Sequence, residues 1–169
     1  MRQTMMIVLV TVLSFEAYAQ HDHAGHDAQK IDEATAKFKD DKLQIAYTHY
    51  IHLKDALVGS NASEAKLAAG DLQKSLMGVN GGKKAADEAA KLAEIKDLDD
   101  QRKAFSTLSN EMTSLVKNGK LASGALYLEH CPMANNNEGG FWLSNEKQIK
   151  NPYFGDAMLK CGSVKETIQ

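Results

Sequence analysis

Cysteine, proline and tryptophan are scarce in this 169-residue chain, which has two, two and one of them. Two cysteines are too few for a small disulfide-dense scaffold, so we expect a hydrophobic core to supply the stability. Both cysteines, both prolines and the tryptophan fall between residues 126 and 162. This concentration distinguishes that segment from the rest of the chain.

Neither sign of charge dominates, because 20 Lys and Arg against 22 Asp and Glu give a formal net charge of −2. Such a balance gives no electrostatic reason to expect nucleic acid or an anionic membrane as partner. The sequence also lacks a Gly-rich phosphate loop and the GxSxG, HExxH and CxxC motifs. Neither cysteine has a second cysteine close to it in the sequence, so no redox-active pair of a thiol enzyme is indicated. We therefore expect a binding protein that is not an enzyme.

Long hydrophobic runs are missing apart from residues 5–15. Arg2 precedes this run and Ala17-Tyr18-Ala19 follows it, which is the pattern of a cleavable signal peptide over residues 1–19. The run is too short to cross a bilayer, and no cysteine follows it for a lipid anchor. We expect cleavage after Ala19, a periplasmic location and no membrane insertion of the mature chain.

A histidine-rich tract opens the expected mature chain, within a polar segment of residues 20–30 that we expect to be disordered. His21, His23 and His26 stand within six residues, with Asp22 between them and Asp27 directly after them. Neutral imidazoles bind Cu(II), Zn(II) or Ni(II), so the tract indicates a weak metal site. An ordinary polar N-terminus remains the alternative interpretation.

Residues 31–169 are expected to form a single domain of the all-α class, an antiparallel four-helix bundle. Apolar residues at three- and four-residue spacing predict helices over residues 31–58, 61–77, 83–96 and 100–116. Asn61 and Glu64 form the pattern of a capping box at the second helix. The predicted core includes Leu53, Leu72, Leu92, Phe105, Leu108 and Met112.

A small irregular lobe is expected over residues 125–169. Short strands are predicted at 125–129 and 141–143, because the glycine- and asparagine-rich residues 135–140 between them favour a turn. Residues 156–161 are predicted to form a last short helix. The aromatic residues of this lobe would then anchor it on one end of the bundle.

Four sulfur-bearing residues of the lobe form two similar halves, Cys131 with Met133 and Met158 with Cys161. Thiolates and thioethers select soft ions, so these residues predict one site for Cu(I) or Ag(I). His130, beside the first cysteine, is a lower-ranked ligand. The alternative is a structural disulfide, because the expected compartment is oxidising. In that interpretation the methionines are core fillers.

Five motifs of the sequence resemble a bacterial domain of unknown function, family 3347. They are YxxLKDALV (50–58), RxxFxxLS (102–109), YxxHCPMA (127–134), WLS (142–144) and IxNPYFGxxMLxCG (149–162). The resemblance spans nearly the whole mature chain but leaves out the histidine tract. It implies a periplasmic helical domain, which in other chains is attached to adaptor subunits of copper and silver efflux pumps.

Together these features predict a periplasmic carrier or buffer of Cu(I) or Ag(I), whose partner is an efflux-pump adaptor or a metallochaperone. The ion would pass to the partner by ligand exchange. The alternative is a disulfide-closed interaction domain that docks on an efflux adaptor and binds no metal.

Overall fold

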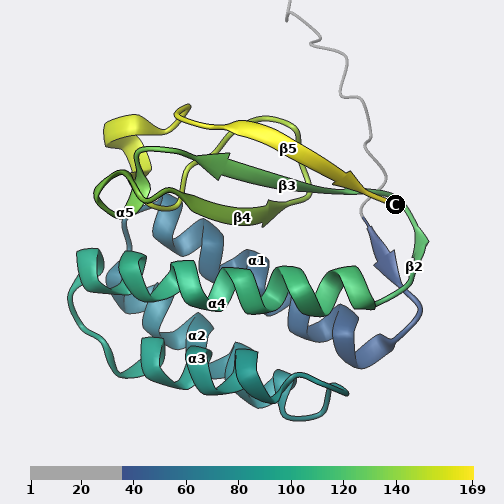
Figure 1. Cartoon of the computed structure of the whole chain (residues 1–169). Coiled ribbons are helices and arrows are strands. Elements are labelled where there is room, and N and C mark those ends of the chain that lie inside the picture. Colours follow the sequence, from purple (N-terminus) through teal and green to yellow (C-terminus); the bar gives the residue numbers. More distant parts are fainter. Residues whose placement is uncertain (1–35) are drawn as a thin grey trace, which may run out of the picture. The chain divides into compact units, whose positions relative to one another are not determined.

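The structure, a computed structural model, describes residues 36–169 (Figure 1). Its helices are α1 (Asp41–Val58), α2 (Ala62–Leu76), α3 (Lys83–Glu94), α4 (Leu98–Asn118), α5 (Ala134–Asn137) and the 3-10 helix η1 (Gly155–Met158). Its strands are β1 (Lys37–Phe38), β2 (Leu121–Ser123), β3 (Leu126–Cys131), β4 (Gly140–Ser144) and β5 (Ser163–Ile168). The expected signal peptide, the segment 20–30 and the first residues of the first predicted helix lie outside the described residues.

The predicted all-α class is wrong, because the fold is mixed α/β. β1 pairs with β2, and β4, β3 and β5 form a three-stranded antiparallel sheet in that order. The expected irregular lobe therefore contains a three-stranded sheet, which lies on the side of α1 and α4 (Figure 1). The last strand was missed because its mostly exposed sequence, SVKETI, lacks the apolar alternation of a half-buried strand.

The four long helices lie where the apolar spacing predicted them, and side-chain caps mark the N-termini of α1, α2 and α4. The carboxylate of Asp40 accepts a hydrogen bond from the Lys42 N–H at 2.9 Å, and the Asn61 side chain accepts one from Glu64 at 3.1 Å. The cap at Asp40 corrects the first boundary: the helix begins at Asp41, whereas the sequence predicted residue 31. The residues before the cap are extended instead and form β1.

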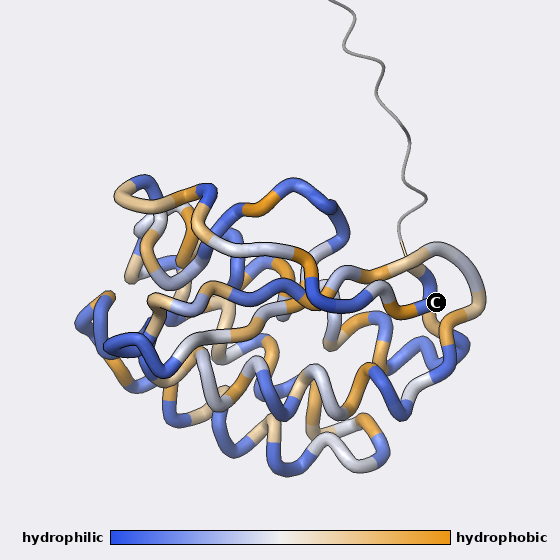
Figure 2. The backbone as a smooth tube through the Cα atoms, turned by 45° about the horizontal axis from the view of Figure 1, so that its top comes forward, coloured by the Kyte–Doolittle hydropathy of each residue, from blue (hydrophilic) through white to orange (hydrophobic). Residues whose placement is uncertain are grey.

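One hydrophobic core joins the helices to the sheet. Figure 2 shows hydrophobic positions recurring along the helices and entering the strands. All six predicted core residues are fully buried, and the sheet adds Leu126, Trp142 and Leu143. The Tyr50 ring stacks on Phe105 of α4 at 5.6 Å between centroids, and its hydroxyl accepts the Leu143 N–H at 3.0 Å. The C-terminal segment is thus a part of the core, whereas the sequence suggested a cap on the bundle end.

Arg102 of α4 fastens the loop that carries the second cysteine to the helices. Its guanidinium donates to the carbonyl of Leu57 at 3.2 Å and to that of Pro152 at 3.1 Å. Gly155 follows with φ of +55°, and a Cβ there would lie 2.6 Å from the Ser60 hydroxyl. A residue with a side chain would therefore both strain the backbone and displace the loop.

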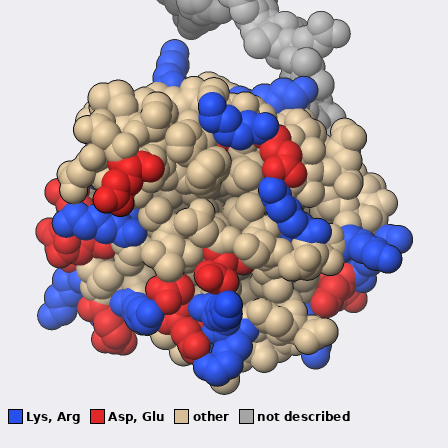
Figure 3. Space-filling view, viewed as in Figure 1, with Lys and Arg blue, Asp and Glu red and all other residues tan. Residues whose placement is uncertain are grey.

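Charged side chains of both signs are interspersed on the face shown in Figure 3. Along the helices, several charged side chains form ion pairs, among them Lys83 with Asp87 at 2.8 Å and Lys103 with Asp100 at 2.9 Å. Exposed pairs of this kind contribute less than about 1 kcal/mol each, so burial of the core has the larger effect on stability. Within residues 36–169, no helix combines the length and the apolar character that crossing a membrane requires.

Candidate thiol site

The two cysteines meet because β5 returns antiparallel to β3. Cys131 is the last residue of β3, and Cys161 comes two residues before β5. The pairing of His130 with Ser163 aligns these two ends of the strands. The two Sγ atoms lie 2.9 Å apart, and both cysteines are free thiols. Cys131 is fully buried and Cys161 is partly exposed, so the pair is reached from solvent on the side of Cys161.

The contact between the thiols alters the acid–base chemistry of Cys161. The hydrogen bond with the Cys131 thiol, followed by burial, raises the pKa of Cys161 above its ordinary value. A reactive nucleophilic cysteine has a lowered pKa, because the thiolate is the attacking form. The raised pKa therefore favours the protonated thiol form of Cys161.

Gly162 keeps Cys161 close to the sheet. Its φ of +140° lies in the region that favours glycine, and an added Cβ would lie 2.9 Å from the Trp142 ring and 3.0 Å from the His130 carbonyl. The backbone after Cys161 can therefore run directly over Trp142. This close approach leaves the thiol of Cys161 directed at Cys131 across the strands.

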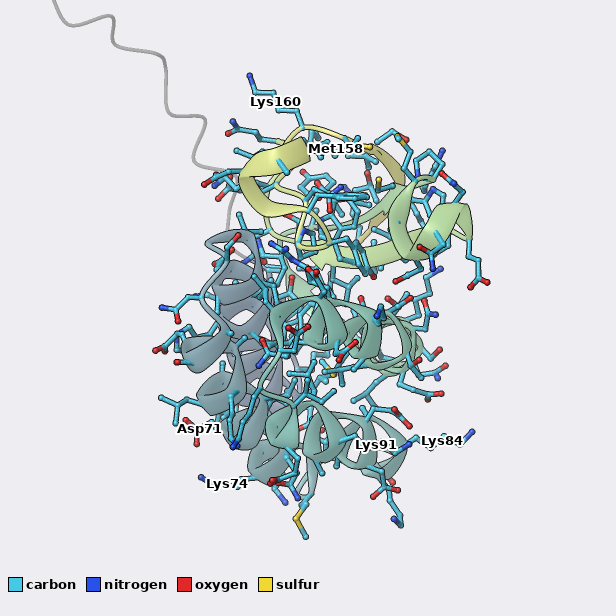
Figure 4. All side chains as sticks on the ribbon, turned by 90° about the vertical axis from the view of Figure 1, so that its left-hand side faces the viewer. Asp71, Lys74, Lys84, Lys91, Met158 and Lys160 are labelled. Atoms are coloured by element: carbon cyan, nitrogen blue, oxygen red, sulfur yellow. The ribbon has the colours of Figure 1, made fainter. Side chains whose placement is uncertain are left out.

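The two predicted methionine ligands share a different part of the lobe. Met133, which is 46% exposed, and Met158 both line a surface cleft of about 650 Å³ with Tyr153 and Phe154. Neither cysteine lines this cleft. Figure 4 shows Met158 at the sheet end of the molecule, far from Asp71 at the opposite end. The structure thus brings the thiols together and the thioethers together, and convergence of all four sulfurs on one ion stays a prediction.

His130 is held by contacts away from the thiols. Its ring packs on Phe141 at 4.3 Å between centroids, and its Nε2 lies against Gly139, where a Cβ would approach to 2.5 Å. Burial, with a smaller effect from Lys165, lowers the pKa of His130, which favours the neutral ring. Its role as a ligand remains a prediction.

Sequence reasoning missed a buried carboxyl group next to this site. Glu129 is 0% exposed, and neither of its carboxyl oxygens has a hydrogen-bond partner among the described residues. Burial raises the pKa of Glu129 to about 8, against smaller lowering effects of Trp142 and Lys54. The Trp142 indole N–H lies across the strands but is itself without a hydrogen bond. The signal in the sequence was an acidic residue inside the otherwise apolar run LYLEHC.

The described residues contain no group of three or more His, Cys, Asp or Glu side chains that would hold a metal ion. The thiol pair by itself would offer a metal two thiolates, and ligation by Met133, Met158 or His130 stays a prediction. Such a small sulfur set suits a soft monovalent ion and not a hard divalent one. The predicted tract of His21, His23 and His26 lies outside the described residues.

A comparison with known protein families gave a match to the helical part of the chain. Residues 46–124 match the family described as "Protein of unknown function (DUF3347)". The chain thus carries a domain of this family, as its motifs indicated. The match runs from α1 to just past β2 and ends before β3, so it is shorter than the resemblance predicted from the sequence and does not include the thiol segment.

The other two comparisons gave no match. No curated protein and no solved structure was found to match this chain.

Proposed function

We propose that this protein is a periplasmic carrier or buffer of soft monovalent metal ions, Cu(I) or Ag(I), with Cys131 and Cys161 as the principal ligands. The observation that supports the proposal is the 2.9 Å contact between the two free thiols. Two thiols already in contact need only a small separation to accept an ion between them. Loss of their protons would then give two thiolates, which prefer soft ions.

Partial exposure of Cys161 fits an ion that is passed on by ligand exchange. A partner's sulfur ligand can approach from the side of Cys161, while buried Cys131 still holds the ion. Met133 and Met158 line a separate cleft, so they would add thioether contacts only after turning towards the thiols. An efflux-pump adaptor or a metallochaperone is the proposed partner, and the histidine tract would add a separate, weak site for a divalent ion.

The same sulfur contact favours a second candidate function, a disulfide-closed interaction domain. A disulfide bond is about 2.05 Å long, so oxidation would need only a small approach of the two sulfurs. Oxidation would remove two protons and two electrons from the pair and leave no thiolate for a metal. The protein would then dock on an efflux adaptor through its folded surface without binding metal.

Titration with Cu(I) against a competing chelator tests the proposal. The reduced wild type is expected to bind one Cu(I). Cys131→Ser or Cys161→Ser should each weaken binding at least 100-fold, a loss on the order of several kcal/mol in binding free energy. The reason is that a hydroxyl is a poor ligand for a soft ion. Met133→Leu and Met158→Leu should weaken it less. Met77→Leu is the matched control, because Met77 is 76% exposed and lies at the end of α2.

Equal Cu(I) binding by the reduced wild type and the double serine variant would contradict the metal site. Counting free thiols in protein isolated from the periplasm then decides between the two candidates. Complete oxidation together with an absence of bound metal would favour the disulfide-closed domain.

A further inference from the structure

The loop that carries Cys161 is closed on one buried side chain, Asn151. This residue is 0% exposed and lies ten positions before the cysteine. Its side-chain amide donates a hydrogen bond to the Cys161 carbonyl at 2.8 Å. Its Oδ1 accepts the backbone N–H of Tyr153 at 2.8 Å, which sets the turn at the start of the loop. One side chain thus links the beginning of the loop to its end.

The backbone of Asn151 adds two further bonds to the same loop. Its N–H donates to the Leu159 carbonyl at 2.9 Å, and its carbonyl accepts the Gly155 N–H at 3.0 Å. The last turn of the loop also holds Cys161, because the Cys161 N–H donates to the Met158 carbonyl at 3.0 Å. The segment 151–161 is therefore a closed loop, and its end position depends on the Asn151 amide.

The two thiols are consequently held in different ways. Cys131 is the buried last residue of β3, the central strand of the sheet, and pairs with Gly140 of β4. Cys161 lies outside the strands, and its position depends on the loop and on the glycine that follows it. Any change in the loop should alter the distance between the sulfurs through Cys161, while Cys131 stays in place.

We infer that Asn151 is a positioning residue for the thiol pair, which holds Cys161 against Cys131 in the geometry needed to share an ion or to form a bond. An amide is required because the position needs a donor towards Cys161 and an acceptor towards Tyr153 at once. The inference deepens the proposed function and rests on it only where metal binding is concerned. The contact between the thiols exists independently of any metal.

Thiol–disulfide equilibrium with glutathione tests the inference without metal. In this exchange the protein dithiol transfers two electrons and two protons to oxidised glutathione, which gives the protein disulfide and two reduced glutathione molecules. The variants are Asn151→Asp and Asn151→Ser, which keep an acceptor for the Tyr153 N–H but have no donor at the distance of the Cys161 carbonyl. Asn61→Ala serves as the control, because it weakens the cap of α2 without a change in the loop.

Both Asn151 variants are expected to lower the equilibrium constant for disulfide formation at least tenfold, or about 30 mV. Asn61→Ala should leave it within twofold of wild type even where it lowers the melting temperature. Unchanged constants in folded Asn151 variants would overturn the inference. Loss of folding in both variants would overturn it as well, because the residue would then serve the whole fold and not the thiol pair in particular.

Cu(I) titration of the same proteins separates this inference from the proposed function. If the wild type binds Cu(I), the Asn151 variants should bind it at least tenfold more weakly. A shifted glutathione equilibrium in a protein that binds no Cu(I) would support the role of Asn151 and contradict the metal carrier. If the wild type binds Cu(I) and the Asn151 substitutions have no effect in either assay, the metal carrier is supported and the role of Asn151 is contradicted.

Discussion

Single residues in this protein combine burial with polar chemistry, and Glu129 is the clearest case. A carboxylate with no hydrogen-bond partner is costly to bury, so the group is held in its protonated form over a wider pH range than usual. Tyr50 represents the opposite situation, since its hydroxyl is paired with Ser109 at 2.7 Å and accepts the Leu143 N–H. Unsatisfied and satisfied polar groups thus lie in the same core.

The unusual pKa of Glu129 predicts a pH-dependent stability. The pKa is raised from 4.5 to about 8 in the folded protein, so unfolding releases a proton between these values. The folded state is therefore favoured below about pH 4.5, and this contribution is lost as the pH rises to about 8. We expect the free energy of unfolding of the wild type, measured with urea at pH 5, 6.5 and 8, to decline by about a few kcal/mol as the pH rises. Glu129→Gln should remove this decline.

Glu138→Gln is the control for this measurement, because Glu138 is exposed. It should retain the wild-type dependence on pH. If the free energy of unfolding of the Glu129→Gln protein varied with pH as steeply as that of the wild type, Glu129 would not be the cause of the pH dependence.

Among the elements, the helices follow from their own sequences, whereas the strands depend on their partners. α4 begins where the Asp97 carboxylate accepts the N–H groups of Asp99 and Asp100, both at 3.0 Å, and its buried stripe includes Phe105. β5 has no such local signal and forms by antiparallel pairing with β3, with a register irregularity between Leu128 and Glu129.

Replacement of Phe105 by alanine tests the packing of α4. The ring is fully buried between Tyr50 and Tyr153, at 5.6 Å and 5.7 Å between centroids. Phe105→Ala should lower the free energy of unfolding by about 3 to 5 kcal/mol, because it leaves a cavity in the core. Chemical denaturation measures the change. Ile45→Ala on α1 should cost far less, since Ile45 is 53% exposed, and a loss below about 1 kcal/mol for Phe105→Ala would contradict the described core.

At the scale of the whole molecule, the described helices and the sheet share one hydrophobic core. The only tryptophan lies on β4, and most of the helical signal comes from α1 to α4, so fluorescence and circular dichroism report on different parts. The bond from the Leu143 N–H to the Tyr50 hydroxyl crosses between these parts inside the core. We expect a single unfolding transition seen by both signals.

Tyr50→Phe probes this connection between α1 and β4. The substitution keeps the ring but removes the acceptor, so the Leu143 N–H is left buried without its partner. We expect a loss of about 1 to 3 kcal/mol with an unchanged dependence on denaturant, and both signals should still move together. Separate transitions for tryptophan fluorescence and helical dichroism would contradict the single unit.

The sequence by itself determined the helices, their caps at residues such as Asn61, the buried stripe and the segment that carries both cysteines. These features depend on residues within three or four positions of each other, where spacing and capping act directly. Only the tertiary structure decided that Cys131 and Cys161 touch, that Met133 and Met158 turn to a separate cleft, and that residues 163–168 form a strand. Such outcomes depend on pairing between residues about 30 positions apart, which the local pattern does not encode.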